Sequence, residues 1–190
     1  MVVLNKIYTK TGDAGETALG DGTRIAKDSL RVDAYGTVDE TNATVGLARL
    51  YAADEMETRL AAIQNDLFDL GADLCRPESA KDKEADYPPL RVNDSQVTRL
   101  ESEIDGMNHA LAPLRSFILP GGTALAAQLH LCRTVSRRAE RLVVSLASEE
   151  KINPQAIRYL NRLSDWFFVA ARVANENGAA DVLWVPGANG

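Results

Sequence analysis

Apolar residues recur at alternating three- and four-residue steps along most of the chain, which is the spacing of amphipathic helices. The clearest example runs through Met56, Leu60, Ile63, Leu67, Leu70 and Leu74. The pattern predicts helices over residues 28–52, 54–76, 94–107, 123–146 and 154–178. Alternation typical of strands is almost absent, so we predict an all-α fold, a five-helix up-and-down bundle.

Capping residues and helix breakers mark several of these boundaries. Pro120-Gly121-Gly122-Thr123 predicts a turn before the fourth helix, which then continues without proline or glycine. Asp94 or Ser95 is expected to cap the third helix. Asn153 followed by Pro154 is expected to open the fifth. These signals agree with the hydrophobic spacing and predict separate helices joined by loops.

Three segments lack the helical spacing: residues 1–27, 77–93 and 179–190. The middle segment combines prolines with charged residues, which predicts a solvated surface loop. The tail contains an apolar run, Val182 to Pro186, that is expected to pack against the rest of the protein. No internal repeat or change in composition marks a second domain. We therefore predict a single domain, in which the bundle spans residues 28–178.

The N-terminal segment interleaves glycine, threonine and lysine, most densely in Thr9-Lys10-Thr11-Gly12-Asp13-Ala14-Gly15-Glu16-Thr17. Glycine lets backbone N–H groups approach an anion, and threonine hydroxyls and lysine ammonium groups add donors and positive charge. We interpret the segment as a candidate phosphate-binding loop. It is not a Walker A motif, because no Gly-Lys-Ser/Thr ends it. A flexible glycine-rich arm is the alternative interpretation.

The fourth helix carries an arginine ladder, Arg133, Arg137 and Arg141, spaced four residues apart, and Glu140 falls in the same sector. Like charges at this spacing disfavour an isolated helix by about 0.2–0.5 kcal/mol per pair. The ladder is therefore expected to face an anion or a carboxylate. Because the core of a bundle is apolar, this sector belongs on an outer or intersubunit face, which favours self-association. A solvated basic face is the alternative.

Asp39 has two interpretations. It lies in Thr37-Val38-Asp39-Glu40, which has the spacing of a capping box near the start of the first helix. Its carboxylate is then either favoured by the dipole at a helix N-terminus or available as a partner for one arginine of the ladder.

Composition narrows the partners further. The chain has 190 residues, 45% of them hydrophobic and 25% charged, as in ordinary globular proteins. Its net charge of -6 argues against nucleic acid as a ligand. Two histidines exclude a His-rich metal centre, and no metal site is predicted. Cys75 and Cys132 are expected to be reduced core residues. Without an apolar run of about 18 residues or a signal peptide, we expect a cytoplasmic protein that does not bind membranes.

Five motifs carry a resemblance to a known family. They are Thr9-Lys10-Thr11-Gly12-Asp13-Ala14-Gly15, Ala34-Tyr35-Gly36-Thr37-Val38-Asp39-Glu40, Phe117-Ile118-Leu119-Pro120-Gly121-Gly122, Cys132-Arg133-Thr134-Val135-Ser136-Arg137-Arg138-Ala139-Glu140-Arg141 and Tyr159-Leu160-Asn161-Arg162-Leu163-Ser164-Asp165. In this order, and over nearly the whole chain, the sequence resembles the PduO-type ATP:cob(I)alamin adenosyltransferases. Together the five motifs are far more specific than any one of them.

This resemblance implies a homotrimer of five-helix bundles, with active sites between adjacent subunits. Arg133 would pair with Asp39 across the interface, and these two residues, Phe117 and Arg137 would have catalytic roles. The implied ATP-binding residues are Thr9, Lys10, Thr11, Gly12, Thr17 and Lys27 of one subunit, with Arg137, Arg138, Glu140, Arg141 and Asn161 of its neighbour.

The resemblance also implies the reaction. Co(I) of a reduced corrinoid, cob(I)alamin, would attack C5′ of ATP and expel triphosphate, giving adenosylcobalamin, with Mg²⁺ helping to screen the phosphates. Phe117 would lie against the lower face of the corrin. There it would help to displace the lower axial ligand and leave four-coordinate Co(II), which is easier to reduce. From the sequence alone, core packing is the other interpretation of this phenylalanine.

The sequence is also compatible with two other kinds of function. The protein could be a non-catalytic nucleotide sensor or corrinoid carrier on the same fold, or a phosphoryl-transfer enzyme that uses the same ATP loop. The products distinguish the three functions. Adenosyl transfer gives adenosylcobalamin with triphosphate, phosphoryl transfer gives ADP or phosphate, and a sensor or carrier gives no product. A cob(II)alamin reductase and an adenosylcobalamin-dependent enzyme are the expected protein partners besides a second copy of the chain.

Overall fold

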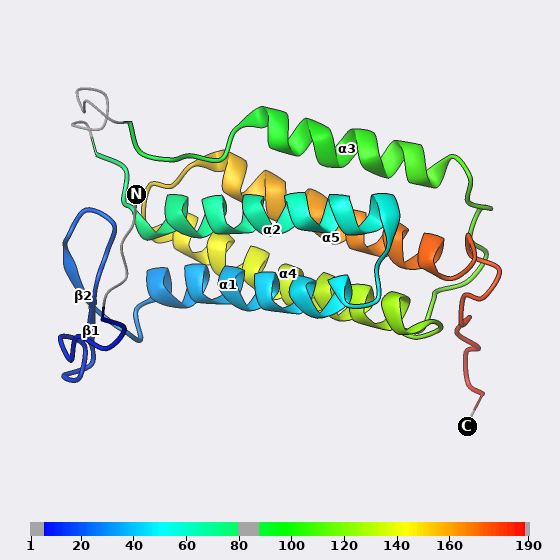
Figure 1. Cartoon of the computed structure of the whole chain (residues 1–190), viewed down its shortest axis with the longest axis horizontal. Coiled ribbons are helices and arrows are strands. Elements are labelled where there is room, and N and C mark those ends of the chain that lie inside the picture. The colour runs from blue at the N-terminus through cyan, green and yellow to red at the C-terminus, as the bar shows by residue number, and fades with distance from the viewer. Residues whose placement is uncertain (1–5, 80–87, 189–190) are drawn as a thin grey trace.

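The computed structural model describes residues 6–79 and 88–188. The helices are α1 (Leu30–Arg49), α2 (Asp54–Cys75), α3 (Asp94–Asn108), α4 (Ala124–Glu149) and α5 (Pro154–Ala174). They run up and down along the long axis of the molecule (Figure 1). Helix α4 packs between α1 and α5, α2 covers α1, and α3 lies along α5. The predicted five-helix, all-α bundle is confirmed.

The residues that carry the hydrophobic spacing form the core. Along α2, Leu60, Ile63, Leu67, Leu70 and Leu74 are all buried, and α5 adds Trp166 and Phe167. The apolar seam of α4 continues through Leu129, Cys132, Ala139, Val143 and Leu146. Cys132 is a free, buried thiol, and burial raises the pKa of its thiol to about 11. Cys75, also a free thiol, is partly exposed at the end of α2.

One of the two predicted caps is present, and the turn predicted before α4 ends in a cap that was not predicted. Thr123 caps α4, because its Oγ1 accepts from Ala126 N at 3.2 Å. Asn153 caps α5 by accepting from Gln155 N at 3.1 Å. The prediction of Asp94 or Ser95 as the cap of α3 is wrong, because Asn93 caps this helix in a capping box with Gln96. Asp94 is already the first helical residue.

The predicted capping box at Thr37 to Glu40 is also wrong. Helix α1 begins at Leu30, so these residues lie in its second and third turns. Thr37 Oγ1 donates to the carbonyl of Asp33 at 2.8 Å, a bond that satisfies a hydroxyl inside a helix. Asp39 is therefore an exposed carboxylate in the middle of α1 and not a residue near its N-terminus.

The N-terminal segment contains a small hairpin that the sequence pattern did not reveal. Strands β1 (Glu16–Ala18) and β2 (Arg24–Ala26) pair antiparallel, with Thr17 opposite Ile25. Three residues are too few to show alternation. A hydrogen bond from Gly20 N to the Cys75 carbonyl, 3.0 Å long, fixes the hairpin to the end of α2.

The structure describes only part of the predicted loop 77–93 and most of the C-terminal tail. Residues 80–87 of the predicted loop 77–93 lie outside the described residues, as do residues 1–5 and 189–190. The tail packs against the segment before α4, as expected, through a bridge between Ile118 and Leu183. In the described part of the chain, no helix is both long and apolar enough to cross a membrane.

Candidate active site

The N-terminal loop gathers the predicted phosphate-binding side chains at the base of the hairpin. Thr9 Oγ1 and Thr11 Oγ1 lie 2.9 Å apart. The Lys27 side chain crosses directly over Gly12, where a Cβ would come within 3.0 Å of the lysine Nζ. Gly12 thus leaves room for Lys27 to lie close to the loop backbone. Thr17 lies in β1. The loop therefore presents hydroxyls and an ammonium group together, mostly at an exposed surface.

The arginine ladder on α4 lacks counter-charges in the described part of the chain. Arg133 is half-buried and its Nε has no hydrogen-bond partner there. Arg137 is exposed, and Arg141 donates to the Arg137 carbonyl at 3.0 Å. Burial, and then the Arg137 guanidinium, lower the pKa of Arg133. Such a row of cations favours an anion brought by a ligand or by another subunit.

The other predicted residues of α4 point to different helices. Glu140 Oε1 accepts from Asn161 Nδ2 of α5 at 2.9 Å, so these two predicted ATP-binding residues do meet. Arg138 turns toward α1, where it forms an exposed ion pair with Glu40. The structure therefore brings Glu140 and Asn161 together and places Arg138 on another side of the helix.

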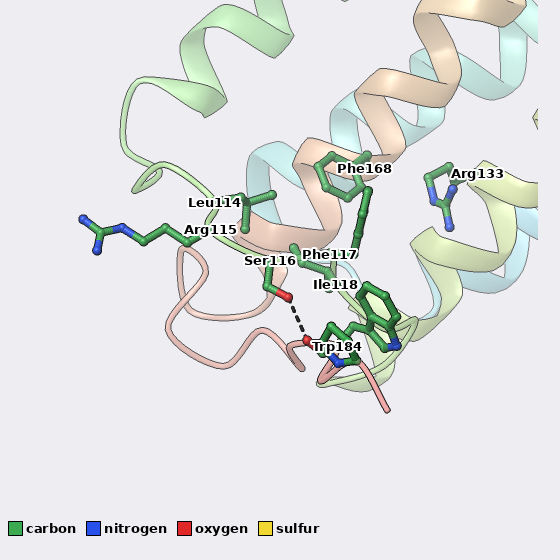
Figure 2. Close-up of a pocket in the computed structure, with 9 residues that line it drawn as sticks. Leu114, Arg115, Ser116, Phe117, Ile118, Arg133, Phe168 and Trp184 are labelled. Atoms are coloured by element: carbon green, nitrogen blue, oxygen red, sulfur yellow. Dashed lines mark hydrogen bonds between the residues drawn. The ribbon is translucent and has the colours of Figure 1, made fainter. Parts of the chain in front are cut away.

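A cavity of about 730 Å³, the Phe117 pocket, opens at the end of the bundle where α4 begins (Figure 2). The Phe117 ring is 77% exposed and lies 5.9 Å from the Trp184 ring. Arg133 faces the pocket from α4, whereas Arg115 points away from the other lining side chains. The pocket is lined by Leu114, Arg115, Ser116, Phe117, Ile118, Arg133, Phe168, Trp184 and Pro186.

Known proteins show what kind of molecule has this combination of features. The sequence signature of the family described as "Cobalamin adenosyltransferase" matches residues 7–174 of the chain. That range includes the N-terminal loop, the arginine ladder and Phe117. The chain belongs to the cobalamin adenosyltransferase family.

The sequences of individual members of the family align with this chain over nearly its full length. A corrinoid adenosyltransferase from Mycobacterium tuberculosis is 47% identical over 190 residues, which cover 98% of this chain and 96% of that protein. One from Bacillus subtilis is 45% identical over 183 residues, covering 93% and 91%. The fold matches a variant PduO-type ATP:corrinoid adenosyltransferase from Lactobacillus reuteri complexed with cobalamin and ATP. That structure has a TM-score of 0.86 and 40% identity, with 95% and 97% of the two chains covered.

In this adenosyltransferase, the N-terminal hairpin and the C-terminal tail, which contributes to the lining of the Phe117 pocket, lie at opposite ends of the bundle (Figure 1). The hairpin is at the start of α1, whereas the C-terminal tail, whose Trp184 and Pro186 line the pocket, is at the far end. Twenty helical residues in α1 separate the two ends by about 30 Å. One subunit cannot place its own loop over its own pocket.

Sequence reasoning missed two aromatic residues of the pocket, Phe168 and Trp184. Phe168 lies next to the buried Phe167 on α5, and its spacing does not distinguish a pocket residue from a core residue. Trp184 belongs to the tail, whose apolar character was the only signal. The described residues contain no group of three or more His, Cys, Asp or Glu side chains that could hold a metal ion.

His130 is a buried titratable group beside the pocket of this adenosyltransferase. Neither ring nitrogen has a hydrogen-bond partner among the described residues. The ring contacts that of Phe168 edge-on, at 6.3 Å between centroids. Burial, and then the Arg133 guanidinium, lower the pKa of His130, which Asp181 opposes. The imidazole is therefore neutral in the folded protein at neutral pH.

We expect this histidine to make the protein less stable in mild acid. Below a pH of about 6.5 the unfolded chain binds a proton at this position that the folded chain does not, so the free energy of unfolding falls. The melting temperature should therefore drop less between pH 7 and pH 5 in His130→Gln than in wild type. His109→Gln, which removes an exposed imidazole, is the control. Equal pH dependence in wild type and His130→Gln would contradict this prediction.

Proposed function

We propose that this protein transfers the 5′-deoxyadenosyl group of ATP to Co(I) of a reduced corrinoid, giving adenosylcobalamin and triphosphate. The observation that carries the proposal is the Phe117 pocket, large and aromatic, with a half-buried and unpaired Arg133 at its edge. The arginine ladder continues from this edge and suits an extended anion. The relative from L. reuteri that binds cobalamin and ATP has the same fold, which supports the assignment.

The reaction does not require a side chain of the protein to transfer a proton. Co(I) is a strong nucleophile, so a Co–C bond forms at C5′ while the C5′–O bond breaks and its electron pair leaves with triphosphate. No general base is needed. The protein brings the two reactants into line, screens the charge that develops on the leaving group, and excludes water.

Charge screening falls to the lysines of the loop and the arginines of α4. We assign ATP binding to Thr9, Lys10, Thr11, Gly12, Thr17 and Lys27 of one subunit, and to Arg137, Arg138, Glu140, Arg141 and Asn161 of its neighbour. Mg²⁺ suits the same task and typically binds through substrate phosphates with one or two carboxylates. Because the described residues offer no ready-made metal cluster, the phosphates themselves would supply most of its ligands.

Phe117 is assigned to the lower face of the corrin. Its ring is exposed and lines the pocket, as a residue that touches a flat substrate must be. A phenyl ring in the place of the lower axial ligand offers cobalt no donor atom. The bound Co(II) would then be four-coordinate and easier to reduce.

We propose a homotrimer with composite sites, and the separation of loop and pocket supports sites that are shared between subunits. A neighbouring copy would bring its loop to the site of the first, because the loop and the pocket of one chain are too far apart to form one site. Helices α1 and α2 and the turn between them also expose Leu47, Leu50, Tyr51 and Phe68, which is typical of an interface. Asp39 lies beside Phe68 on this surface. Asp39 and Arg133 each lack an ion pair with the described residues, so they can pair between subunits.

We expect Asp39→Asn to lower turnover by about 10²-fold, because it leaves Arg133 without its carboxylate. Breaking a fully buried pair costs about 3–5 kcal/mol, and the half-buried Arg133 is expected at the lower end of that range, where about 3 kcal/mol corresponds to about 10²-fold. The double variant Asp39→Arg with Arg133→Asp should recover part of the activity. Asp33→Asn, a charge removal on the same helix, is the control. Steady-state turnover measures the activity, and sedimentation velocity measures the assembly of the subunits. Wild-type values for Asp39→Asn in both measurements would refute the pairing.

Anaerobic incubation with ATP and chemically reduced cobalamin tests the proposed function. Loss of the Co(I) absorption, formation of adenosylcobalamin and release of one triphosphate per turnover are the expected results. ADP or phosphate would instead indicate phosphoryl transfer. Binding of both ligands without any product would indicate a sensor or carrier. The proposal extends to a cytoplasmic location, with a cob(II)alamin reductase and an adenosylcobalamin-dependent enzyme as partners, consistent with two free thiols.

A further inference from the structure

A buried polar network, here called the tail anchor, joins three segments behind the Phe117 pocket. It consists of Arg172, Asn175 and Asp181, and the side chains of Arg172 and Asp181 are only 7% and 3% exposed. Arg172 Nε donates to Asp181 Oδ2 at 2.9 Å, and Arg172 Nη2 donates to the Ala112 carbonyl at 2.9 Å. Asn175 Nδ2 donates to the other Asp181 oxygen at 3.3 Å.

The same network fixes the turn that follows Phe117. Asn175 Nδ2 also donates to the Gly121 carbonyl at 3.2 Å, and Asn175 Oδ1 accepts from Thr123 N at 2.9 Å. Gly122 has a φ of 96°, and a Cβ there would lie 2.2 Å from Asn175 Oδ1. Only glycine fits this position, so the turn is folded tightly around the buried amide.

The tail leads directly from the anchor to the pocket. Val182, the residue after Asp181, accepts from Leu119 N at 2.7 Å. Trp184 N donates to the Phe117 carbonyl at 2.8 Å, and Ser116 Oγ donates to the Trp184 carbonyl at 2.7 Å. The backbone of Phe117 is thus held from both sides, by the turn and by the tail. Asp181 is linked to both, because it accepts a hydrogen bond from Asn175, which holds the turn, and directly precedes Val182 of the tail.

A role in stability alone does not account for this placement. A buried ion pair gives little net stabilisation, because the desolvation of two charges offsets most of their attraction. Its geometry, however, is well defined, since each carboxylate oxygen accepts one hydrogen bond from a different helix-end residue. Such a network can therefore hold a flexible tail in one position.

We propose that Asp181 is a positioning residue, which sets the Phe117 ring and the Trp184 ring for the corrinoid by way of Arg172 and Asn175. The proposal rests on the proposed function, because it assigns the pocket to a corrinoid. Asp181 itself does not line the pocket. Its effect on the reaction is transmitted through the tail and the Pro120-Gly121-Gly122 turn.

Asp181→Asn tests the proposal with little change in volume. The new amide presents N–H where an acceptor oxygen was, so either the Arg172 or the Asn175 contact is lost. Loss of one charge-assisted bond corresponds to about a tenfold weakening. We expect the Kd of cob(II)alamin to rise about tenfold, and the fraction of four-coordinate Co(II), measured by electron paramagnetic resonance with ATP present, to fall. The Kd of ATP should stay at the wild-type value.

Two further variants complete the experiment. Glu55→Gln removes an exposed carboxylate that pairs with Arg59 within α2, and it should leave all three measurements unchanged. Ser116→Ala removes one hydrogen bond to the tail without altering the anchor, and it should give a smaller change of the same kind. If Asp181→Asn does not fold, Asp181→Glu, which keeps the charge but moves both acceptor oxygens, decides the question by the same three measurements.

The outcomes separate this proposal from the proposed function. A lower melting temperature in Asp181→Asn, with wild-type cob(II)alamin binding and spectrum, would overturn the positioning role and leave a stability role. Equal weakening of ATP and corrinoid binding would also overturn it. If wild type binds cob(II)alamin but forms no product, the proposed function fails, yet the ratio of the two Kd values still tests Asp181. Absence of corrinoid binding by wild type would overturn both.

Discussion

Phe117→Ala is expected to keep the melting temperature of wild type within a few degrees and to lose most of its activity when the reaction starts from cob(II)alamin. The ring is 77% exposed, so its removal creates no cavity in the core. The contact of a phenyl group with a corrin, about 1.5–3 kcal/mol, corresponds to about a ten- to hundredfold loss of rate. The variant should still bind ATP.

The defect should depend on the oxidation state of the cobalt supplied. With Co(I) prepared chemically, the lower ligand is already absent, so Phe117→Ala should be only moderately slower. With Co(II) reduced on the enzyme, the ligand stays bound and the defect should be much larger. Phe167→Ala is the matched control, because this neighbouring phenylalanine of α5 is fully buried. Its loss should cost about 3–5 kcal/mol of stability. Equal defects in the two assays would return Phe117 to a packing role.

Arg137→Ala is expected to lower turnover on the order of 10²–10³-fold without unfolding the bundle. The guanidinium is exposed, pairs with no described carboxylate, and lies one turn from Arg133 at the edge of the Phe117 pocket. Removing it should therefore weaken the stabilisation of the leaving triphosphate. Steady-state turnover at saturating ATP and cob(I)alamin is the measurement. Lys151→Ala, which removes an exposed cation beyond the end of α4, should have little effect. Near-normal turnover in Arg137→Ala would contradict the phosphate assignment.

The helices were predictable because their apolar faces repeat over many residues. The row from Leu60 to Leu74 is buried at every predicted position. The start of α1 was not predictable from Thr37 to Glu40, because a capping-box spacing also occurs inside a helix when threonine bonds to the preceding turn. The hairpin was missed because each of its strands has only three residues.

The candidate site was predictable where residues share one helix or one short motif. The arginine ladder is visible in the sequence from its four-residue spacing, and its three guanidinium groups pair with no described carboxylate. The anion or carboxylate that it is expected to face stays a prediction. The meeting of Trp184 with Phe117 could not be foreseen, because 66 residues separate them in the chain (184 minus 117, less one). Arg138 was grouped with Arg137 by motif, yet helical geometry sends it to Glu40.

The placement of the N-terminal loop and the Phe117 pocket at opposite ends of the bundle has a genetic consequence (Figure 1). In the closed ring of identical subunits proposed above, each chain would contribute its loop to one site and its pocket to the next. A copy with a damaged loop and a copy with a damaged pocket can therefore complement each other when they assemble together, since one of their junctions joins two intact halves. If every chain carries both a damaged loop and a damaged pocket, no junction in the assembly joins two intact halves.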